Sequence, residues 1–258
     1  MELLPSTNQE IKKLGMLLLR CASMMQAGGS NTSRIRNSID RIAHQFRVSA
    51  ELFITHQAIF ITLTDANEAH VFSAVKRNKH PGVNFRVVSG ISRMSWKINT
   101  TKWSLQEIQG ELDRLETLPR FAAWTVTCMV GLSGAGFCGL SGGRPSAMLV
   151  ACMSTVAGQC IRHQFTQRKI NPYFCTFFAA LGATLISGLP NKLFPDMGFE
   201  VAFITSVLFL IPGVPLFNAF TDLLEGNILN GCLRAVNGLL ISFMIALGFL
   251  LSLFIFKF

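Results

Sequence analysis

Three polar side chains, Asn218, Asp222 and Arg234, follow a helix break in the C-terminal part of the chain. The break is the Pro-Gly-Val-Pro sequence at 212–215, where each proline removes a backbone donor and the glycine loosens the backbone. A guanidinium group can attract the carboxylate of a small solute, and an aspartate can carry a proton. The candidates for a substrate pathway or gate are therefore Pro212, Gly213, Pro215, Asn218, Asp222 and Arg234.

The break interrupts an apolar segment at 201–221 that is long enough to be a membrane span. Backbone groups freed inside a bilayer cost several kcal/mol unless protein, water or a solute satisfies them. One interpretation is a cavity lined by protein, and the other is a packing kink followed by ordinary loop polarity. Likewise, Asp222 and Arg234 are either an ion pair or two hydrated charges at the ends of spans.

The composition separates a polar first part from an apolar second part. The chain has 258 residues, of which 50% are hydrophobic and 14% charged, whereas soluble domains have about a quarter charged residues. Of the 23 Lys and Arg residues, 16 lie within residues 1–120. The net charge of +9 does not indicate nucleic-acid binding, because the basic residues are mixed with acids and form no stripe with aromatics.

No catalytic or metal-binding pattern stands out in the sequence. The cysteines include no CxxC pair, and the histidines have no metal-ligand spacing with Cys or carboxylates. Neither a nucleophile elbow nor a glycine-rich phosphate loop is present. We therefore expect no enzyme activity, no metal and no cofactor.

Residues 1–118 are predicted to form a cytoplasmic α+β domain that begins with two helices. Apolar residues recur at helical spacing over 11–25 and 35–46. Gly28-Gly29 ends the first helix, and either Ser30 or Asn31 caps the second. The same Gly-Gly-Ser sequence is only a weak signal for an anion-binding loop, since it is more often a turn that ends a helix.

The middle of this domain is predicted to be a small sheet, followed by two more helices. Runs rich in Phe, Ile, Val and Thr predict strands at 51–55, 58–63, 69–74 and 84–88, with turn residues at 65–68. Apolar spacing after the fourth strand predicts a helix through Ile91 and Ile98. Ser104 and Glu107 have the spacing of a capping box at the start of the last helix.

Residues 119–258 are predicted to form a transmembrane domain of five helices. Each apolar stretch has about the 17 to 25 residues that a helix needs to cross a bilayer. The expected spans are 121–140, 145–161, 172–189, 201–221 and 235–256. The sequence thus predicts an α-helical polytopic membrane protein with an N-terminal cytoplasmic α+β domain.

Small residues on the first three spans predict close packing between helices, because small side chains let helix backbones approach each other in lipid. These residues are Gly131, Gly134, Ser154, Gly158, Ala179 and Ala183. A simple membrane anchor would not need such faces, so we expect a packed bundle.

The distribution of Lys and Arg beside the spans predicts the orientation. One side of the membrane would have Arg114, Arg120, Arg162, Arg168, Lys169 and Arg234, and the other would have Arg144, Lys192 and Lys257. Since Lys and Arg are retained on the cytoplasmic side, the N-terminus is expected in the cytoplasm and the C-terminus in the periplasm.

Four segments resemble the threonine/serine exporter (ThrE-like) family of bacterial inner-membrane proteins. They are Gly28 to Arg34, Phe85-Arg-Val-Val, Gly131-Leu-Ser-Gly-Ala-Gly-Phe, and the run from Ile211-Pro-Gly-Val-Pro-Leu-Phe-Asn through Asp222, Gly226 and Arg234. The last segment is the most specific of the four. The resemblance covers nearly the full length and favours the split form of the family, in which a YjjP-type subunit works with a shorter, all-membrane YjjB-type partner.

The resemblance implies a secondary exporter subunit in the bacterial inner membrane, with succinate or a similar dicarboxylate as substrate. Threonine or serine, the substrates of the fused members, are the alternative. It implies pathway or gating positions at Pro212, Gly213, Asn218, Asp222 and Arg234. Two other classes stay open: a membrane-anchored cytoplasmic enzyme or sensor, and a structural subunit that supports the partner's pore.

Overall fold

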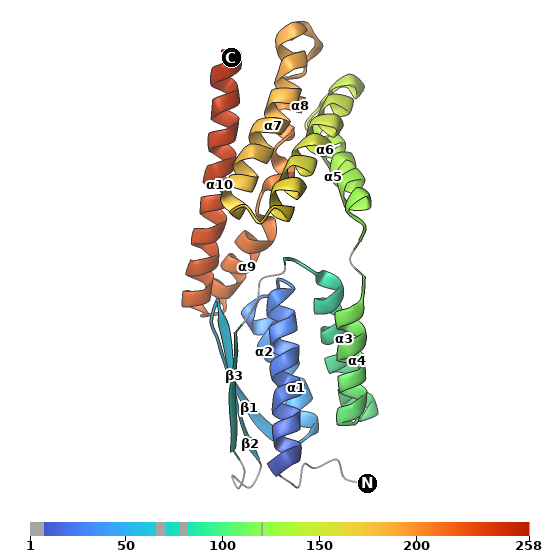
Figure 1. Ribbon diagram of the computed structural model, residues 1–258, viewed down its shortest axis with the longest axis vertical. Helices are drawn as coiled ribbons and strands as arrows, with labels where there is room; N and C mark the ends of the chain where they lie inside the picture. Colours follow the sequence, from blue (N-terminus) through green and yellow to red (C-terminus); the bar gives the residue numbers. More distant parts are fainter. Residues whose placement is uncertain (1–7, 66–70, 78–81, 120, 258) are drawn as a thin grey trace. The chain divides into compact units, whose positions relative to one another are not determined.

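The computed structural model describes residues 8–65, 71–77, 82–119 and 121–257, which form two compact units (Figure 1). The first unit contains residues 1–119 together with 214–235, and the second contains 120–213 together with 236–258. One limit of the first unit is Pro119. Residues 214–235, which sequence analysis placed with the spans, have their contacts in the first unit.

The described part of the first unit is an α+β structure in the expected order of helices, sheet and helices. Its elements are α1 (Asn8–Ala27), α2 (Thr32–Gln45), β1 (Val48–Ile54), β2 (Ala58–Asp65), β3 (Val71–Arg77), α3 (Phe85–Thr101) and α4 (Leu105–Thr117), joined by most of α9 (Gly213–Leu224) and the first turns of α10 (Ile228–Phe256). The predicted turn at 65–68 falls mostly outside the described residues.

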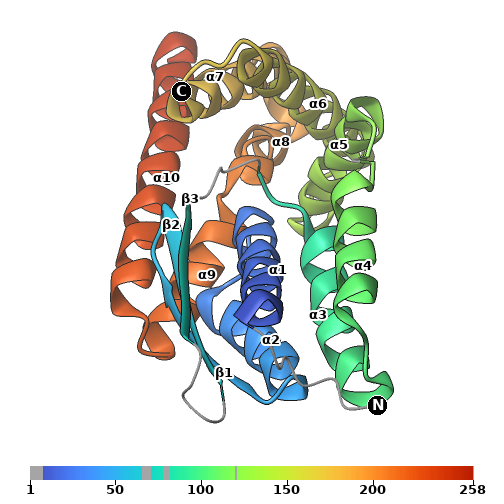
Figure 2. The same ribbon diagram turned by 60° about the horizontal axis from the view of Figure 1, so that its bottom comes forward.

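The three described strands form an antiparallel sheet in the order β1-β2-β3, with Ile54 opposite Ile59 and Ile61 opposite Ala74. Figure 2 shows α1 and α2 on one face of this sheet and α3 with α4 beyond them. The core lies between these layers, where Ile59 and Ile61 of β2 are buried with apolar residues from all four helices. Alternation of side chains along each strand accounts for this one-sided burial.

The opposite face of the sheet is exposed and partly apolar. Phe53, Phe60 and Val75 lie opposite one another on the three strands and are 62%, 46% and 58% exposed. The Phe53 and Phe60 rings are 6.0 Å apart between centroids, a distance typical of cross-strand aromatic pairs. This face of the sheet therefore exposes apolar side chains.

The predicted fourth strand at 84–88 is wrong, because α3 begins at Phe85. Val87, Val88, Ile91 and Met94 are buried on one face of this helix. That spacing is helical, and it outweighs the local preference of the valines for strands. At the other end of the domain the capping box is confirmed, since the Ser104 hydroxyl accepts from the Glu107 N–H and Glu107 accepts from the Ser104 N–H.

The second unit is helical throughout its described residues. Its elements are α5 (Ala123–Leu140), α6 (Pro145–Gln167), α7 (Pro172–Leu193), η1 (Pro195–Met197), α8 (Glu200–Thr205), η2 (Leu208–Leu210) and the remainder of α10. Helix α6 contacts α5 on one side and α7 on the other, and α8 packs against all three.

Three described helices, α5, α7 and α10, are long and apolar enough to cross a membrane. The segments Glu200–Leu210 and Gly213–Leu224 together would make a fourth span, but they are bent by 59° at the break. This bend lies where the two prolines predict it. Helix α6 has 23 residues, but it is not among the described helices that are apolar enough to cross a membrane. A topology of five spans therefore stays a prediction.

The small residues noted in the sequence lie at contacts within the second unit. A methyl group added at Gly131 would lie 2.4 Å from Val156, and one at Gly134 would lie 2.4 Å from Thr155, both on α6. At Gly158 the added carbon would lie 3.0 Å from the Ala179 carbonyl and from Ala183 on α7. Ser154 is fully buried and donates to the Ala151 carbonyl within α6.

We predict that Gly134→Ala destabilises the chain by about 1–3 kcal/mol, because its methyl group forces α5 and α6 apart. Gly136, two residues along the same helix, is the matched control, since no described atom lies within 4 Å of its added carbon. Thermal unfolding of the full chain in detergent measures both. Equal midpoints for Gly134→Ala and Gly136→Ala would show that the α5–α6 contact is loose.

Candidate functional site

A buried polar cluster joins the start of α2 to the α9–α10 segment within the first unit. We call this group, made of Thr32, Asp222, Asn230 and Arg234, the Asp222 cluster. Helix α9 ends at a turn where Gly226 has a φ of +79°, a conformation that favours glycine, and the Asn227 N–H donates to the Asp222 carbonyl at 2.7 Å. This turn sends the chain back, so that α10 places Arg234 beside Asp222.

The Asp222 side chain is fully buried, accepts two hydrogen bonds from Thr32 and forms an ion pair with Arg234. The Thr32 N–H donates to Oδ1 at 2.9 Å, the Thr32 hydroxyl donates to Oδ2 at 3.1 Å, and Arg234 Nε lies 3.3 Å from Oδ2. Thr32 is the first residue of α2, whose N-terminal N–H groups carry a partial positive charge. Burial of a carboxylate is costly, and here a helix end and a cation offset that cost.

The rest of the cluster ties the same two segments together through backbone carbonyls. Arg234 Nη2 donates to the Ser30 carbonyl at 3.0 Å, and Asn218 Nδ2 donates to the Gly29 carbonyl at 2.8 Å. Asn230 Nδ2 donates to the Ile54 carbonyl at 2.8 Å and lies 3.4 Å from the Thr32 hydroxyl, which accepts from it. Three polar side chains of α9 and α10 thus hold the loop before α2 and the end of β1.

The loop before α2 ends α1 and caps α2, since the N–H groups of Gly28, Gly29 and Ser30 donate to carbonyls of α1. Gly29 has a φ of +90°, which only glycine adopts readily, and Asn31 caps α2 by accepting from the Arg34 N–H at 3.1 Å. The Asn31 side chain therefore satisfies one free N–H of the helix, and Asp222 satisfies another at Thr32. Ser30, which precedes Asn31, is 97% buried, and its hydroxyl has no partner among the described atoms.

The structure brings together only part of the residue set chosen from the sequence. Asn218, Asp222 and Arg234 lie in or beside the cluster, and the ion pair of the last two is present. Pro212 and Gly213 belong to the second unit, where they form the bend, and Pro215 lies in the first turn of α9. Pro212, Gly213 and Pro215 therefore set the position at which α9 begins.

Thr32 and Asn230 complete the cluster but were not among the candidates from sequence. A signal for Thr32 existed, because it follows Gly28-Gly29-Ser30-Asn31, a turn that opens a helix with free N–H groups. Asn230 had no such signal, since nothing in the sequence indicates that α10 passes beside the end of β1.

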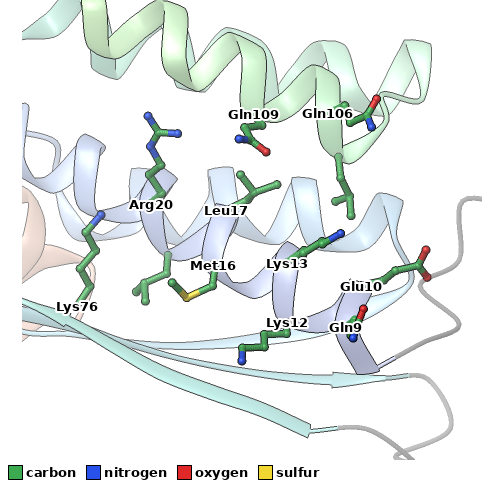
Figure 3. A pocket seen from close by; sticks show the side chains of 12 residues that line it. Gln9, Glu10, Lys12, Lys13, Met16, Leu17, Arg20, Lys76, Gln106 and Gln109 are labelled. Atoms are coloured by element: carbon green, nitrogen blue, oxygen red, sulfur yellow. The ribbon is translucent and has the colours of Figure 1, made fainter.

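A second concave region lies between α1, α4 and β3, with a volume of about 1130 Å³ (Figure 3). Its cations are Lys12, Lys13, Lys76 and Arg20. The lysines are exposed, and Arg20 already pairs with Asp113 at 2.6 Å and with Glu116. The hydrogen bond to Glu116 raises the pKa of Arg20. The basic side chains of this groove are therefore either exposed to solvent, as the lysines are, or paired with carboxylates, as Arg20 is.

Residues 16–256 match the family model described as "Putative threonine/serine exporter" (ThrE). The chain belongs to this family. As a ThrE-family member with apolar helices long enough to span a bilayer, it is a membrane protein.

Two curated relatives are similar over nearly the full length. The chain is 26% identical to the "Probable succinate transporter subunit YjjP" of Klebsiella aerogenes over 247 residues, which are 95% of this chain and 94% of that protein. It is also 26% identical to the protein of the same name from Escherichia coli K12 over 240 residues, or 92% of each. The family member is thus of the YjjP type. No solved structure matches the chain.

We predict that Asp222→Ala lowers the free energy of unfolding by about 3–5 kcal/mol, because it leaves the partly buried Arg234 without its counter-charge and the buried Thr32 donors without their acceptor. Glu225→Gln is the control, since Glu225 is exposed on the following turn. Thermal unfolding of the detergent-solubilised chain is the measurement. A midpoint for Asp222→Ala within about half a degree of the control would contradict the importance of this pair.

Proposed function

We propose that this chain is one subunit of a two-component secondary exporter of small dicarboxylates, with succinate as the first candidate substrate. Three findings support the proposal: the family match, the names of two relatives that are similar over nearly the full length, and the Asp222 cluster. The names describe those relatives, and at 26% identity the substrate of this chain is inferred from them together with its own residues.

The single observation that carries the proposal is the fully buried Asp222 carboxylate, paired with the partly buried Arg234 next to the start of α2. Ionisable groups in transporters that are buried and paired mark routes for ions and solutes. Arg234 supplies the charge that attracts a dicarboxylate, and Asp222 is the candidate proton carrier. The segment that holds Asp222 begins at the helix break, and broken helices in transporters place backbone groups at the solute.

The proposed topology places five spans in the bacterial inner membrane, with the N-terminal domain in the cytoplasm and the C-terminus in the periplasm. The excess of Lys and Arg on one side of the spans supports this orientation. A proton or ion gradient would drive export. The bend at 211–213 would lie in the fourth span.

The proposed partner is a shorter, all-membrane subunit of the YjjB type. Support comes from the word "subunit" in the names of both relatives. The exposed apolar side chains of α5 and α10 also support it, because they need either lipid or another helix beside them.

Threonine or serine export is the alternative, which the description of the family favours. An α-carboxylate would use the same cation, so the Asp222 cluster by itself fits both substrate classes. Metabolite measurements separate them. A strain that lacks this chain and its partner would accumulate succinate inside in one case and threonine or serine in the other.

We predict that Asp222→Asn and Arg234→Ala reduce succinate export by at least about tenfold, because each removes one charge from the proposed pathway. Export is measured in cells that express both subunits, as extracellular succinate over time. Glu225→Gln is the control, and membrane content and co-purification with the partner show which variants assemble. Wild-type rates in assembled Asp222→Asn and Arg234→Ala proteins would remove both residues from the mechanism.

A further inference from the structure

We propose that a concave region between α3 and α4 is a binding site for a compact oxyanion that carries at least two negative charges. This region, which we call the α3–α4 pocket, has a volume of about 460 Å³ and shares no residue with the Asp222 cluster. The proposal goes beyond the exporter function, because it gives the N-terminal domain a ligand of its own. The lining residues on which it depends are Gly90, Arg93, Lys97, Trp103, Glu111 and Arg114.

The packing of α3 against α4 brings three cations into this pocket. Arg93 and Lys97 are four residues apart on α3, so they lie on the same face of the helix. The two helices approach closely at Gly90, where an added carbon would lie 2.4 Å from Leu115 of α4. Arg114 of α4 lines the same pocket. Two neighbouring helices, seen together in Figure 2, thus supply three positive charges to one concave region.

These cations are not balanced by carboxylates. Among the described residues that line the pocket, Glu111 is the one carboxylate, and it accepts from Arg114 at 2.7 and 2.5 Å. Neither Arg93 nor Lys97 forms an ion pair with any residue that the structure describes. Three positive charges and one negative charge leave a net charge of +2. Because like charges four residues apart on a helix repel each other, this arrangement destabilises the domain unless an anion joins it.

The electrostatic field of the unpaired cations reaches the Glu111 carboxylate. The pKa of Glu111 is lowered first by its hydrogen bond to Arg114 and further by the charges of Lys97 and Arg93, against the opposing effect of burial. Both cations of α3 therefore act on the space beside Glu111. An anion held in that space is stabilised by the same charges.

The types of side chain define the class of ligand. A guanidinium group binds an oxyanion through two parallel N–H donors, and a lysine adds a mobile point charge. An anion with a charge of −2 or more neutralises the net charge of the pocket. The volume is within the range of small-ligand sites, so a compact anion fits. Phosphates and carboxylates share this chemistry, and hydration of each cation separately would not explain why the three line one pocket.

The test uses the full chain in a nonionic detergent, with pyrophosphate and succinate as probes at constant ionic strength. Trp103 lines the pocket and serves as a local reporter. The chain has three tryptophans, and Trp96 and Trp124 are 60% and 72% exposed. Replacing these two by Phe leaves Trp103 as the source of tryptophan fluorescence. We expect a saturable fluorescence change with a dissociation constant below about 1 mM for at least one probe, and none with chloride.

Three variants separate a binding role from a structural one. Lys97→Ala should weaken binding by about tenfold, the loss expected for one hydrogen bond to a charged group. Lys13→Ala is the matched control, since it removes the same charge from an exposed lysine in the groove of Figure 3 and should leave the affinity unchanged. Glu111→Gln should tighten binding by about fivefold, because it removes a negative charge and frees Arg114. A structural role for this ion pair predicts no gain in affinity.

The proposal is overturned if neither probe gives a saturable signal, if Lys97→Ala and Lys13→Ala bind equally well, or if Glu111→Gln binds no more tightly than the wild type. Thermal midpoints show that the variants are folded, and an exposed pair such as Glu111–Arg114 contributes little to them. Tighter binding of pyrophosphate would assign a phosphate ligand, and tighter binding of succinate a carboxylate. These results are independent of export, because no variant alters the Asp222 cluster.

Discussion

A buried carboxylate needs hydrogen-bond donors or a cation beside it, and the structure around Asp222 meets that requirement. The side chain is fully buried, so its charge has to be met by the start of α2 on one side and by Arg234 on the other. Meeting it brings together segments that are about 190 residues apart in the chain. The first unit is therefore built from an N-terminal domain and a returning segment, and neither alone contains the complete cluster.

The cluster also connects recognition chemistry to the helices that can span a membrane. Helix α10 begins in the first unit, where it holds Asn230 and Arg234, and continues as a long apolar helix in the second. Helix α9 likewise follows the bend of the broken segment. The cluster thus lies on residues that are covalently continuous with two candidate spans. The groove between α1 and α4 has no such connection.

Much of the local structure could be predicted because its causes are local. The capping box at Ser104, the end of α1 before Gly28-Gly29 and the bend after Leu210 each follow from the preferences of a few neighbouring residues. The strand predicted at 84–88 was wrong because its cause is not local. Its valines favour a strand locally, and the decisive fact, burial of every third or fourth residue against α2 and α4, depends on the packed domain.

By itself, the sequence determined that a carboxylate and a cation follow a helix break along the chain, and that the chain has a polar first part and an apolar second part. Only the tertiary structure decided which groups the Asp222 carboxylate and the polar side chains of α10 contact. Hydropathy and spacing report on one helix at a time, so they cannot show that the Asp222 carboxylate reaches the Thr32 N–H, or that Asn230 reaches the end of β1. The left-handed turn at Gly226 and the docking of α9 on the loop before α2 make those contacts.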